Sequence, residues 1–224
     1  MPAKHISISI SRAIVSSLIV MLVSLGTFAQ EKADSTRLFR GVAVSADLVG
    51  VVQLAVSDYG QYEVAARINL RDKYFPIVEA GIGKADAEEV TTKLTYKTSA
   101  PYFRAGCDFN LLKNKHDDYR LYGGFRYAYA SFKYDLESPG TDDPVWGDHT
   151  EYGMKGVACS YHWLEAVAGI DAKIWRNLRM GWSLRYKRRL LHDDGELDNT
   201  WYVPGYGKQG NSRLGGTFNI IFEL

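Results

Sequence analysis

The stretch Ser160-Tyr161-His162 places a hydroxyl and an imidazole two residues apart, the side chains that a serine hydrolase uses as nucleophile and base. On a β-strand, residues two apart point to the same face, so these two side chains would be neighbours. The nearest acid, Glu165, is an odd number of residues away from both, so it would point to the other face of the strand. Since the rest of the chain has no Gly-x-Ser-x-Gly elbow, P-loop or His-Glu-x-x-His helix, we predict no catalytic site and no cofactor.

The acidic run Asp193-Asp194-Gly195-Glu196-Leu197-Asp198-Asn199 suggests calcium ligands. It lacks the EF-hand spacing, in which carboxylates alternate before the glycine, so we predict a solvated loop and no metal site. The 27 Lys and Arg residues against 26 Asp and Glu give a formal charge of +1. Nucleic-acid binding proteins usually carry a strong basic excess, so this balance indicates no nucleic-acid partner.

The N-terminus has the pattern of an export signal. Lys4 and Arg12 form a basic region, residues 13–26 are uncharged and mostly apolar, and Thr27-Phe28-Ala29 offers small residues at a cleavage site. The apolar run is shorter than the roughly 20 residues that a membrane-spanning helix needs. We therefore expect residues 1–29 to be a cleaved signal peptide and residues 30–224 to be the exported domain.

The exported domain repeats the period-2 alternation that is typical of strands. In 178–189, for example, Leu178, Met180 and Trp182 fall on one face and Arg179, Ser183 and Arg185 on the other. A helix cannot give this division, because its apolar stripe recurs every three to four residues. The pattern predicts eight strands near residues 39–50, 61–70, 74–84, 100–110, 119–132, 158–173, 178–190 and 213–224.

The predicted connections alternate between long and short. Long loops are expected at 51–60, 85–99, 133–157 and 191–212, and short turns at 71–73, 111–118 and 174–177. An up-and-down membrane barrel has this alternation, with apolar residues outside and polar ones inside. A soluble barrel would reverse the two faces. We predict an all-β fold, an eight-stranded antiparallel up-and-down transmembrane β-barrel in the cell outer membrane.

Five short motifs in the exported domain are similar to those of a known protein family. These motifs are Ser57-Asp58-Tyr59-Gly60-Gln61-Tyr62-Glu63, Arg71-Asp72-Lys73-Tyr74-Phe75-Pro76, Cys107-Asp108-Phe109-Asn110-Leu111-Leu112-Lys113-Asn114-Lys115, Tyr186-Lys187-Arg188-Arg189 and Arg213-Leu214-Gly215-Gly216-Thr217-Phe218. Through them the chain resembles an uncharacterised, domain-of-unknown-function family of Bacteroidota outer-membrane β-barrel proteins. The resemblance covers essentially the whole exported domain. It implies location and fold, and it implies no catalytic residues. The chain ends in Leu224, where outer-membrane barrels generally have an aromatic residue.

Strand parity assigns a set of charged side chains to the barrel interior. The expected lumen residues are Asp47, Glu63, Glu79, Asp108, Glu165, Asp171 and Glu223, with Arg67, Arg104, Arg120, Arg126, Lys173, Arg179, Arg185, Lys187, Arg189 and Arg213. Eight strands leave an interior just wide enough for side chains, and buried charges are costly unless they are paired. We predict a charge network that plugs the barrel. The alternative is a narrow, anion-preferring channel, since the predicted set has three more cations than anions.

The remaining expectations concern the outer surface. Tyr186 and Arg188 point outward at the loop end of their strand, where they are expected to contact lipid headgroups and lipopolysaccharide phosphate. Loops 133–157 and 191–212 are candidate surfaces for an extracellular ligand, and the barrel-assembly machinery is the expected partner during insertion. The expected role is structural or surface interaction. A further alternative is a lipid A acyl hydrolase, in which Ser160 and His162 would face lipid as in small outer-membrane lipid A deacylases.

Overall fold

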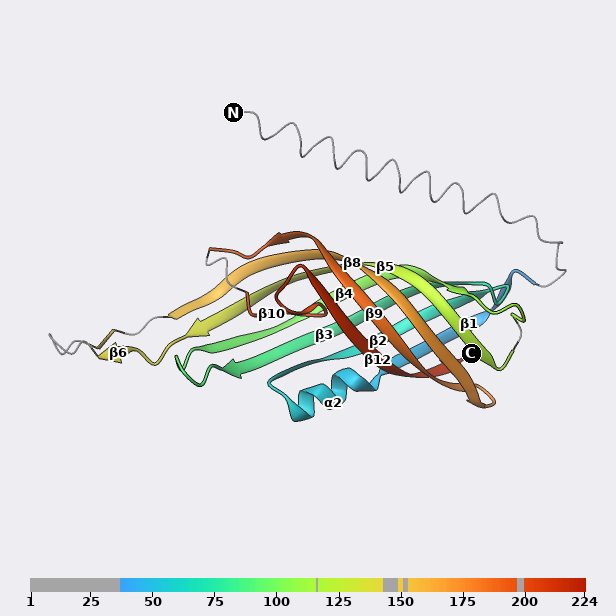
Figure 1. The fold of residues 1–224 in the computed structure, drawn as a ribbon, viewed down its shortest axis with the longest axis horizontal. Helices are drawn as coiled ribbons and strands as arrows, with labels where there is room; N and C mark the ends of the chain where they lie inside the picture. The colour runs from blue at the N-terminus through green and yellow to red at the C-terminus, as the bar shows by residue number, and fades with distance from the viewer. Residues whose placement is uncertain (1–36, 116, 143–148, 151–152, 197–199) are drawn as a thin grey trace, which may run out of the picture. The chain divides into compact units, whose positions relative to one another are not determined.

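The computed structural model describes residues 37–115, 117–142, 149–150, 153–196 and 200–224 (Figure 1). The predicted signal peptide, residues 1–29, lies outside the described residues. Within the described part of the chain, helices are too short or too polar to cross a bilayer.

Eight antiparallel strands close into one barrel, in the order β1-β12-β9-β8-β5-β4-β3-β2. Their bounds are β1 Phe39–Asp47, β2 Tyr59–Leu70, β3 Tyr74–Glu88, β4 Thr95–Asn110, β5 Tyr119–Glu137, β8 Gly153–Trp175, β9 Leu178–Asp193 and β12 Ser212–Glu223. The other elements are the helix α2 Leu48–Val56 and two short hairpins, β6 Thr141–Asp142 with β7 His149–Thr150 and β10 Tyr202–Val203 with β11 Gly207–Lys208. The prediction of an all-β, eight-stranded antiparallel barrel is confirmed.

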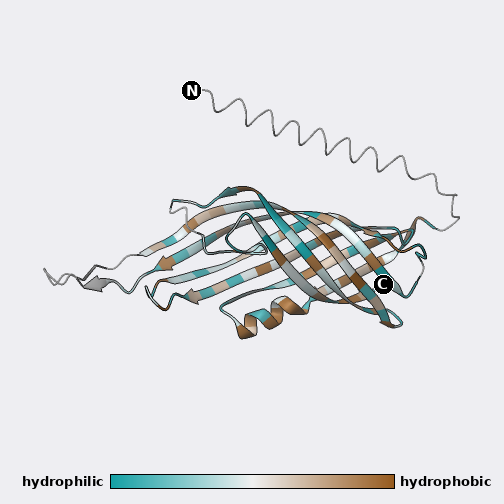
Figure 2. Ribbon diagram, viewed as in Figure 1, coloured by the Kyte–Doolittle hydropathy of each residue, from teal (hydrophilic) through white to brown (hydrophobic). Residues whose placement is uncertain are grey.

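Burial alternates along the strands and separates an apolar outside from a charged inside. On β9, Trp182 and Leu184 are exposed on the outer face, whereas Ser183, Arg185 and Lys187 are buried. Apolar residues are spread over the outer wall, as the brown bands on the strands show (Figure 2). A soluble barrel would have the opposite arrangement, because water would solvate its outer face. The fold is therefore that of a transmembrane β-barrel.

The two ends of the barrel differ in their connections. At one end, called the turn end here, the connections are 71–73, 111–118 and 176–177, and at the loop end they are 48–58, 89–94, 138–152 and 194–211. The connection expected as a long loop at 85–99 is mostly strand, because Ala85–Glu88 pair with Thr95–Thr98. The remaining six residues, 89–94, are fewer than those of the turn-end connection 111–118, so the strict alternation of long and short connections is wrong at this point.

The first strand is shorter than its predicted range 39–50. β1 ends at Asp47, whose carboxylate accepts hydrogen bonds from the backbone N–H groups of Val49 and Gly50 (both 3.1 Å) and so caps α2. Aspartate is a favoured N-cap because its side chain satisfies N–H groups that have no partner within the helix. The predicted loop 51–60 is therefore largely helical.

The longest strands, β5 and β8, form a ribbon that continues beyond the loop end (Figure 1). Their pairing runs as far as Glu137 and Gly153, so the predicted loop 133–157 reduces to residues 138–152. The ribbon carries the β6–β7 hairpin at its tip.

Candidate functional site

The loop that was expected to project outward at 191–212 instead sends its hairpin into the barrel. Residues 202–206, which comprise β10 and the turn that leads to β11, are all buried. Tyr202, Val203 and Tyr206 pack in one hydrophobic cluster with aromatic side chains from the strand walls, including Tyr102, Tyr161 and Trp163. This cluster, here called the upper tier, fills the lumen at the loop end.

Hydrogen bonds fix the hairpin to strands β4 and β2. The Tyr96 hydroxyl donates to the carbonyl of Tyr202 (2.8 Å), and the Tyr202 hydroxyl donates to the carbonyl of Gly60 (3.1 Å). Burial raises the pKa of the Tyr202 phenol, so this hydroxyl stays protonated and can donate. At the start of the loop, Asp194 accepts hydrogen bonds from Tyr161 and Thr200. Asp194 belongs to the acidic run that suggested calcium, and its carboxylate holds the loop instead.

The hairpin tip depends on Gly205. Its φ of +79° is favourable for glycine, and a Cβ atom there would lie 2.5 Å from the Tyr102 ring. The Gly205 carbonyl accepts hydrogen bonds from Arg104 Nη2 (2.7 Å) and Lys187 Nζ (2.6 Å). The tip of the hairpin is thus bonded to cations that belong to the next layer of the lumen.

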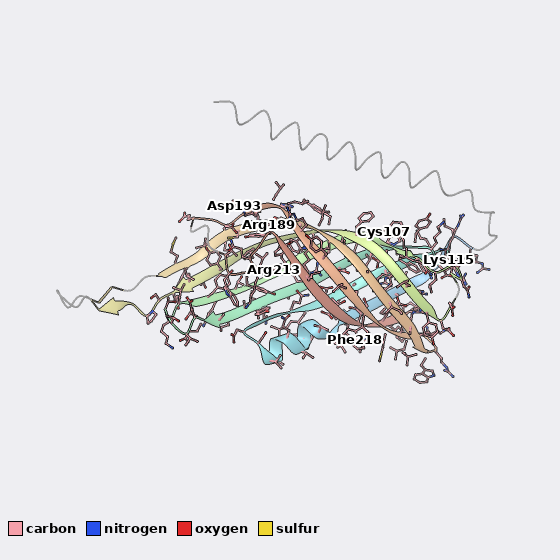
Figure 3. All side chains as sticks on the ribbon, viewed as in Figure 1. Cys107, Lys115, Arg189, Asp193, Arg213 and Phe218 are labelled. Carbon is pink, nitrogen blue, oxygen red and sulfur yellow. The ribbon has the colours of Figure 1, made fainter. Side chains whose placement is uncertain are left out.

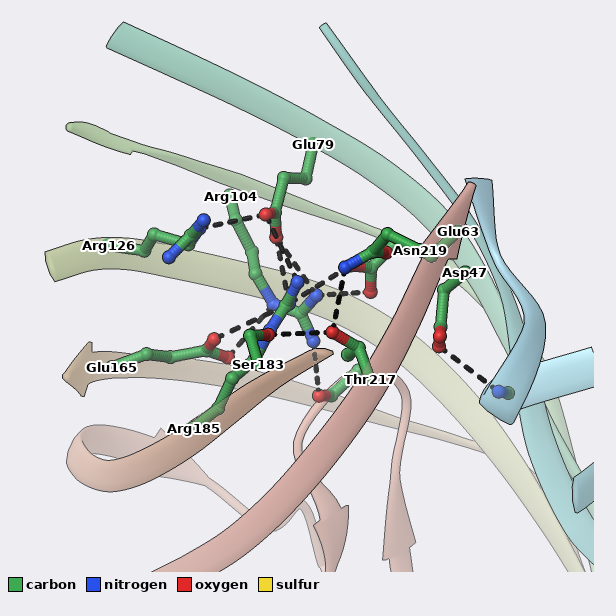
Figure 4. A network of polar contacts seen from close by, with 12 residues as sticks. Asp47, Glu63, Glu79, Arg104, Arg126, Glu165, Ser183, Arg185, Thr217 and Asn219 are labelled. Atoms are coloured by element: carbon green, nitrogen blue, oxygen red, sulfur yellow. Dashed lines mark hydrogen bonds and ion pairs between the residues drawn. The ribbon is translucent and has the colours of Figure 1, made fainter. Parts of the chain in front are cut away.

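That next layer, the middle tier, consists of Glu63, Glu79, Glu165, Arg104, Arg126, Arg185 and Lys187, all buried. Figure 4 shows its glutamates and arginines. Glu79 lies at the centre of this tier. Its carboxylate oxygens are 2.8 Å from Arg126 Nε, 3.0 Å from Arg185 Nη1 and 3.2 Å from Arg104 Nη1. Charge-assisted hydrogen bonds of this kind are the strongest that side chains make.

The other two acids of the middle tier bind the same arginines. Glu63 pairs with Arg104 and, at 3.0 Å, with Arg185, and it also accepts a hydrogen bond from the Tyr102 hydroxyl (2.6 Å). Glu165 lies 2.9 Å from Arg104 Nε and accepts a hydrogen bond from Trp163 Nε1 (2.7 Å). Strands far apart in sequence are therefore connected across the lumen by charge pairs.

A lower tier continues the network toward the turn end, with Arg67, Asp108, Arg120, Asp171, Arg179 and Glu223. Asp171 accepts from Arg179 Nε (2.6 Å) and Arg67 Nη1 (3.3 Å). Arg120 pairs with Glu223 at 2.7 Å. Asp108 joins the two tiers, since it lies 3.1 Å from Arg126 Nη2 and 3.4 Å from Arg67 Nη2.

The space left in the lumen is small where the charges meet. A cavity of about 10 Å³ remains among residues of the middle and lower tiers, including Glu63, Glu79 and Arg185. This volume is close to the minimum for one water molecule. At the turn end the lumen opens into a vestibule of about 240 Å³ lined by polar side chains, among them Arg67, Arg120 and Arg179.

Three predicted lumen charges lie at the ends of the barrel, where Lys173 and Arg213 are exposed and Arg189 is half-buried. Asp47 caps α2, but it is buried and lines the cavity of about 10 Å³. Arg213 donates to the carbonyls of Lys208 (2.7 Å) and Gln209, near the loop end (Figure 3). The alternation of side chains gives the face of a strand on which a residue lies, but not its position along the barrel axis. Residues at the strand ends were therefore assigned to the filled part of the lumen, which they do not enter. Without these three cations the predicted surplus of positive charge disappears.

The predicted outward residues are found on the outer wall. Tyr186 and Arg188 are exposed on β9. On β8, Ser160 and His162 share the outer face, but His162 Nδ1 is 2.6 Å from the Tyr127 hydroxyl. The His162 ring also packs against Tyr129, tilted by 38° with centroids 4.6 Å apart.

Strand register places Asp193 opposite Ser160, and this acid was considered above as a calcium ligand but not as a partner of Ser160 and His162. Its carboxylate accepts a hydrogen bond from the Gly195 N–H (3.0 Å). The His162 imidazole is thus engaged with two tyrosines, and the Asp193 carboxylate with the loop backbone.

Other candidate chemistry does not assemble in the described part of the chain. No group of three or more His, Cys, Asp and Glu side chains there has the geometry of a metal site. Cys107 and Cys159 are free thiols, with Cys159 buried in the upper tier and Cys107 half-buried.

The fold and its closed, charged interior define a small transmembrane β-barrel. The chain belongs to the family described as a domain of unknown function, DUF6048, whose match covers residues 8–223. A comparison with curated proteins gives no match.

Solved structures with a similar course of the chain include those of three bacterial proteins. Neisserial surface protein A is 12% identical over 83% of this chain and 99% of its own, with a TM-score of 0.47. CarO2 of Acinetobacter baumannii is 12% identical over 85% and 100%, with a TM-score of 0.45. Ail, the attachment invasion locus protein of Yersinia pestis, is 12% identical over 82% and 98%, with a TM-score of 0.42. At such identities, likeness does not extend beyond the general fold.

Proposed function

We propose that this protein is a closed, non-enzymatic barrel of the outer membrane that acts through its outer surfaces and not through its lumen. The observation that carries the proposal is the cavity of about 10 Å³ at the charge network, below a lumen end filled by the β10–β11 hairpin. A conducting pore needs a continuous path of water. Here the charge network and the β10–β11 hairpin lie one behind the other along the lumen, and each fills it. The network also stabilises the barrel, because the buried acids Glu63, Glu79, Asp108, Glu165 and Asp171 are each paired with arginines.

The outer-membrane location is supported by the outer wall. Exposed apolar side chains cover it, and most of the polar backbone groups of the wall are paired between strands, as a hydrocarbon environment requires. Tyr186 and Arg188 on β9 fit contact with lipid headgroups and lipopolysaccharide phosphate. During insertion, the barrel-assembly machinery would handle the chain.

The β5–β8 ribbon is the better candidate for extracellular contact. Of the two predicted ligand loops, 191–212 uses its aromatic residues Tyr202 and Tyr206 inside the lumen. The ribbon carries exposed charged side chains, among them Lys155, which pairs with Glu137 at 2.8 Å. We propose that a surface ligand or partner binds the ribbon, including the segment 138–152 at its tip.

Single-channel conductance tests the proposal. The exported domain is refolded in detergent, checked for a heat-sensitive gel shift and added to planar bilayers. We expect no steady current, because the middle tier closes the lumen even if the hairpin moves. Steady current through well-folded protein would overturn the closed barrel and restore the channel.

A further inference from the structure

We propose that the groove between α2 and the outer barrel wall binds an acyl chain of lipid A, with the lipid phosphate held at the loop end by Lys208. The inference deepens the proposed function, since it needs the barrel to lie in the outer membrane with its loop end outward. It arises from an incomplete seam in the wall.

The seam lies between β12 and β2. β1 pairs with β12 only from Ala43 to Asp47, opposite residues 223 to 219. Beyond Asp47, residues 212–218 of β12 pair with β9 alone, and residues 59–63 of β2 pair with β3 alone. On the loop-end side of Asp47 the wall therefore lacks one strand.

The helix α2 occupies the place of the missing strand, in contact with both β2 and β12 (Figure 1). Glycines allow this close approach, because a Cβ atom on Gly50 would lie 2.4 Å from the Gln61 carbonyl oxygen and one on Gly60 would lie 2.6 Å from the Leu54 backbone N. Asp47 Oδ1 also accepts a hydrogen bond from the Phe218 N–H (3.1 Å), a donor just past the end of the β1 ladder.

An apolar groove runs where α2 meets the wall. Its volume is about 590 Å³, and its lining consists of Leu48, Val49, Val52, Gln53, Val56, Ser57, Tyr59, Trp182 and Phe218. Aliphatic side chains of α2 face a wall formed by Trp182 and Phe218, whose ring centroids are 4.5 Å apart. Two of the valines are well exposed, Val52 at 59% and Val56 at 78%. An exposed helix of this composition belongs in hydrocarbon, not in water.

Two observations select lipid A as the occupant. The groove is continuous with the lipid-facing wall through Trp182, which is 61% exposed on β9, so an acyl chain reaches it without leaving the bilayer. At its loop end, Tyr59 lies under a cation, with Lys208 Nζ 5.2 Å from the ring centroid. An ammonium group beside the end of an apolar groove matches a lipid whose phosphate is close to its acyl chains. In the outer leaflet that lipid is lipid A.

Native mass spectrometry of the refolded exported domain tests the inference, with purified lipid A or phosphatidylglycerol as the added lipid. The groove-filling variant Val52→Trp is compared with Val78→Trp, since Val78 has the same 59% exposure on the outer face of β3. We expect Val52→Trp to lower lipid A retention by about tenfold and Val78→Trp to leave it unchanged.

The headgroup contact has its own pair of variants. Lys208→Gln is expected to weaken lipid A retention severalfold, whereas Lys84→Gln, which removes a similar cation beside Tyr62 at 5.8 Å, has no effect. Equal retention in the two tryptophan variants would overturn the groove, and equal retention of phosphatidylglycerol or an unaffected Lys208→Gln would overturn the choice of lipid A. A wild-type chain that fails to enter liposomes would instead overturn the proposed function.

Discussion

Glu79 is the acid at the centre of the middle tier, with three arginines within 3.2 Å of its carboxylate. Replacing Glu79 with glutamine removes the negative charge that Arg104, Arg126 and Arg185 share in this buried site. Breaking a buried pair in this way costs roughly 3–5 kcal/mol. We expect Glu79→Gln to lower the free energy of unfolding by about that amount, measured by guanidinium titration of the barrel in detergent micelles.

The control for this measurement is Asp86→Asn. Asp86 pairs with Lys97 at 3.6 Å, and both side chains are more than half exposed. Exposed pairs contribute less than about 1 kcal/mol, so the control should remain close to the wild type. A Glu79→Gln barrel as stable as Asp86→Asn would mean that the middle tier is not a connected network.

Ser160 provides a second test at the residue scale. Because the His162 ring is hydrogen-bonded to Tyr127 and packs against Tyr129, we expect Ser160→Ala to leave the lipid composition of the membrane unchanged. Mass spectrometry of lipid A from cells that express the wild type or the variant measures this. Loss of an acyl chain in the wild type alone would show that Ser160 is a nucleophile.

Parity in the sequence was enough to select the paired residues of the middle tier, among them Glu63, Arg104 and Glu165. The same alternation placed Arg189 and Arg213 in the lumen, which is wrong. Alternation gives the face on which a residue lies, but it does not show whether that part of the strand still borders the lumen. The partners of each charge also depend on register across the barrel. Arg185 and Glu79 are 106 residues apart, and only the closed wall brings them together.

At the scale of elements, the hairpin is the segment whose position the sequence did not reveal. Its residues Tyr202, Val203 and Tyr206 are more apolar than an exposed loop requires, and this composition is the signal that could have suggested burial. The helix α2 was missed for a related reason. The run Leu48–Val56 is almost continuously apolar, so it has neither the period of an amphipathic helix nor that of a strand.

The docking of the hairpin can be tested at its tip. A Cβ atom on Gly205 would overlap the Tyr102 ring, so Gly205→Ala is expected to displace the hairpin and make the bond after Lys208 sensitive to trypsin. Gly207→Ala is the matched control, since Gly207 also has a positive φ of +111° but its Cβ would meet nothing within 4 Å. Limited proteolysis followed by mass spectrometry gives the cleavage rates. Equal rates in both variants would show that contact with Tyr102 does not hold the hairpin.

At the scale of the whole molecule, the turn end and the loop end of the barrel predict its orientation in the membrane, with the loop end outward. We expect a cysteine at Lys155, in the ribbon, to react with a membrane-impermeant maleimide on intact cells, and a cysteine at Lys113, in a turn-end connection, to react only after lysis. Both side chains are exposed, and Cys107 and Cys159 are first replaced by serine and alanine. Labelling of Lys113→Cys on intact cells would reverse the orientation.

The short pairing of β1 with β12 has a mechanical consequence. Five residue pairs close the cylinder there, Ala43–Asp47 with Asn219–Glu223, whereas β5 and β8 are matched from Tyr119 to Glu137. Rupture under force begins where the fewest bonds share the load, so this barrel would unzip along the line at which its first and last strands meet. Closing this line is the step that turns a curved sheet into a cylinder.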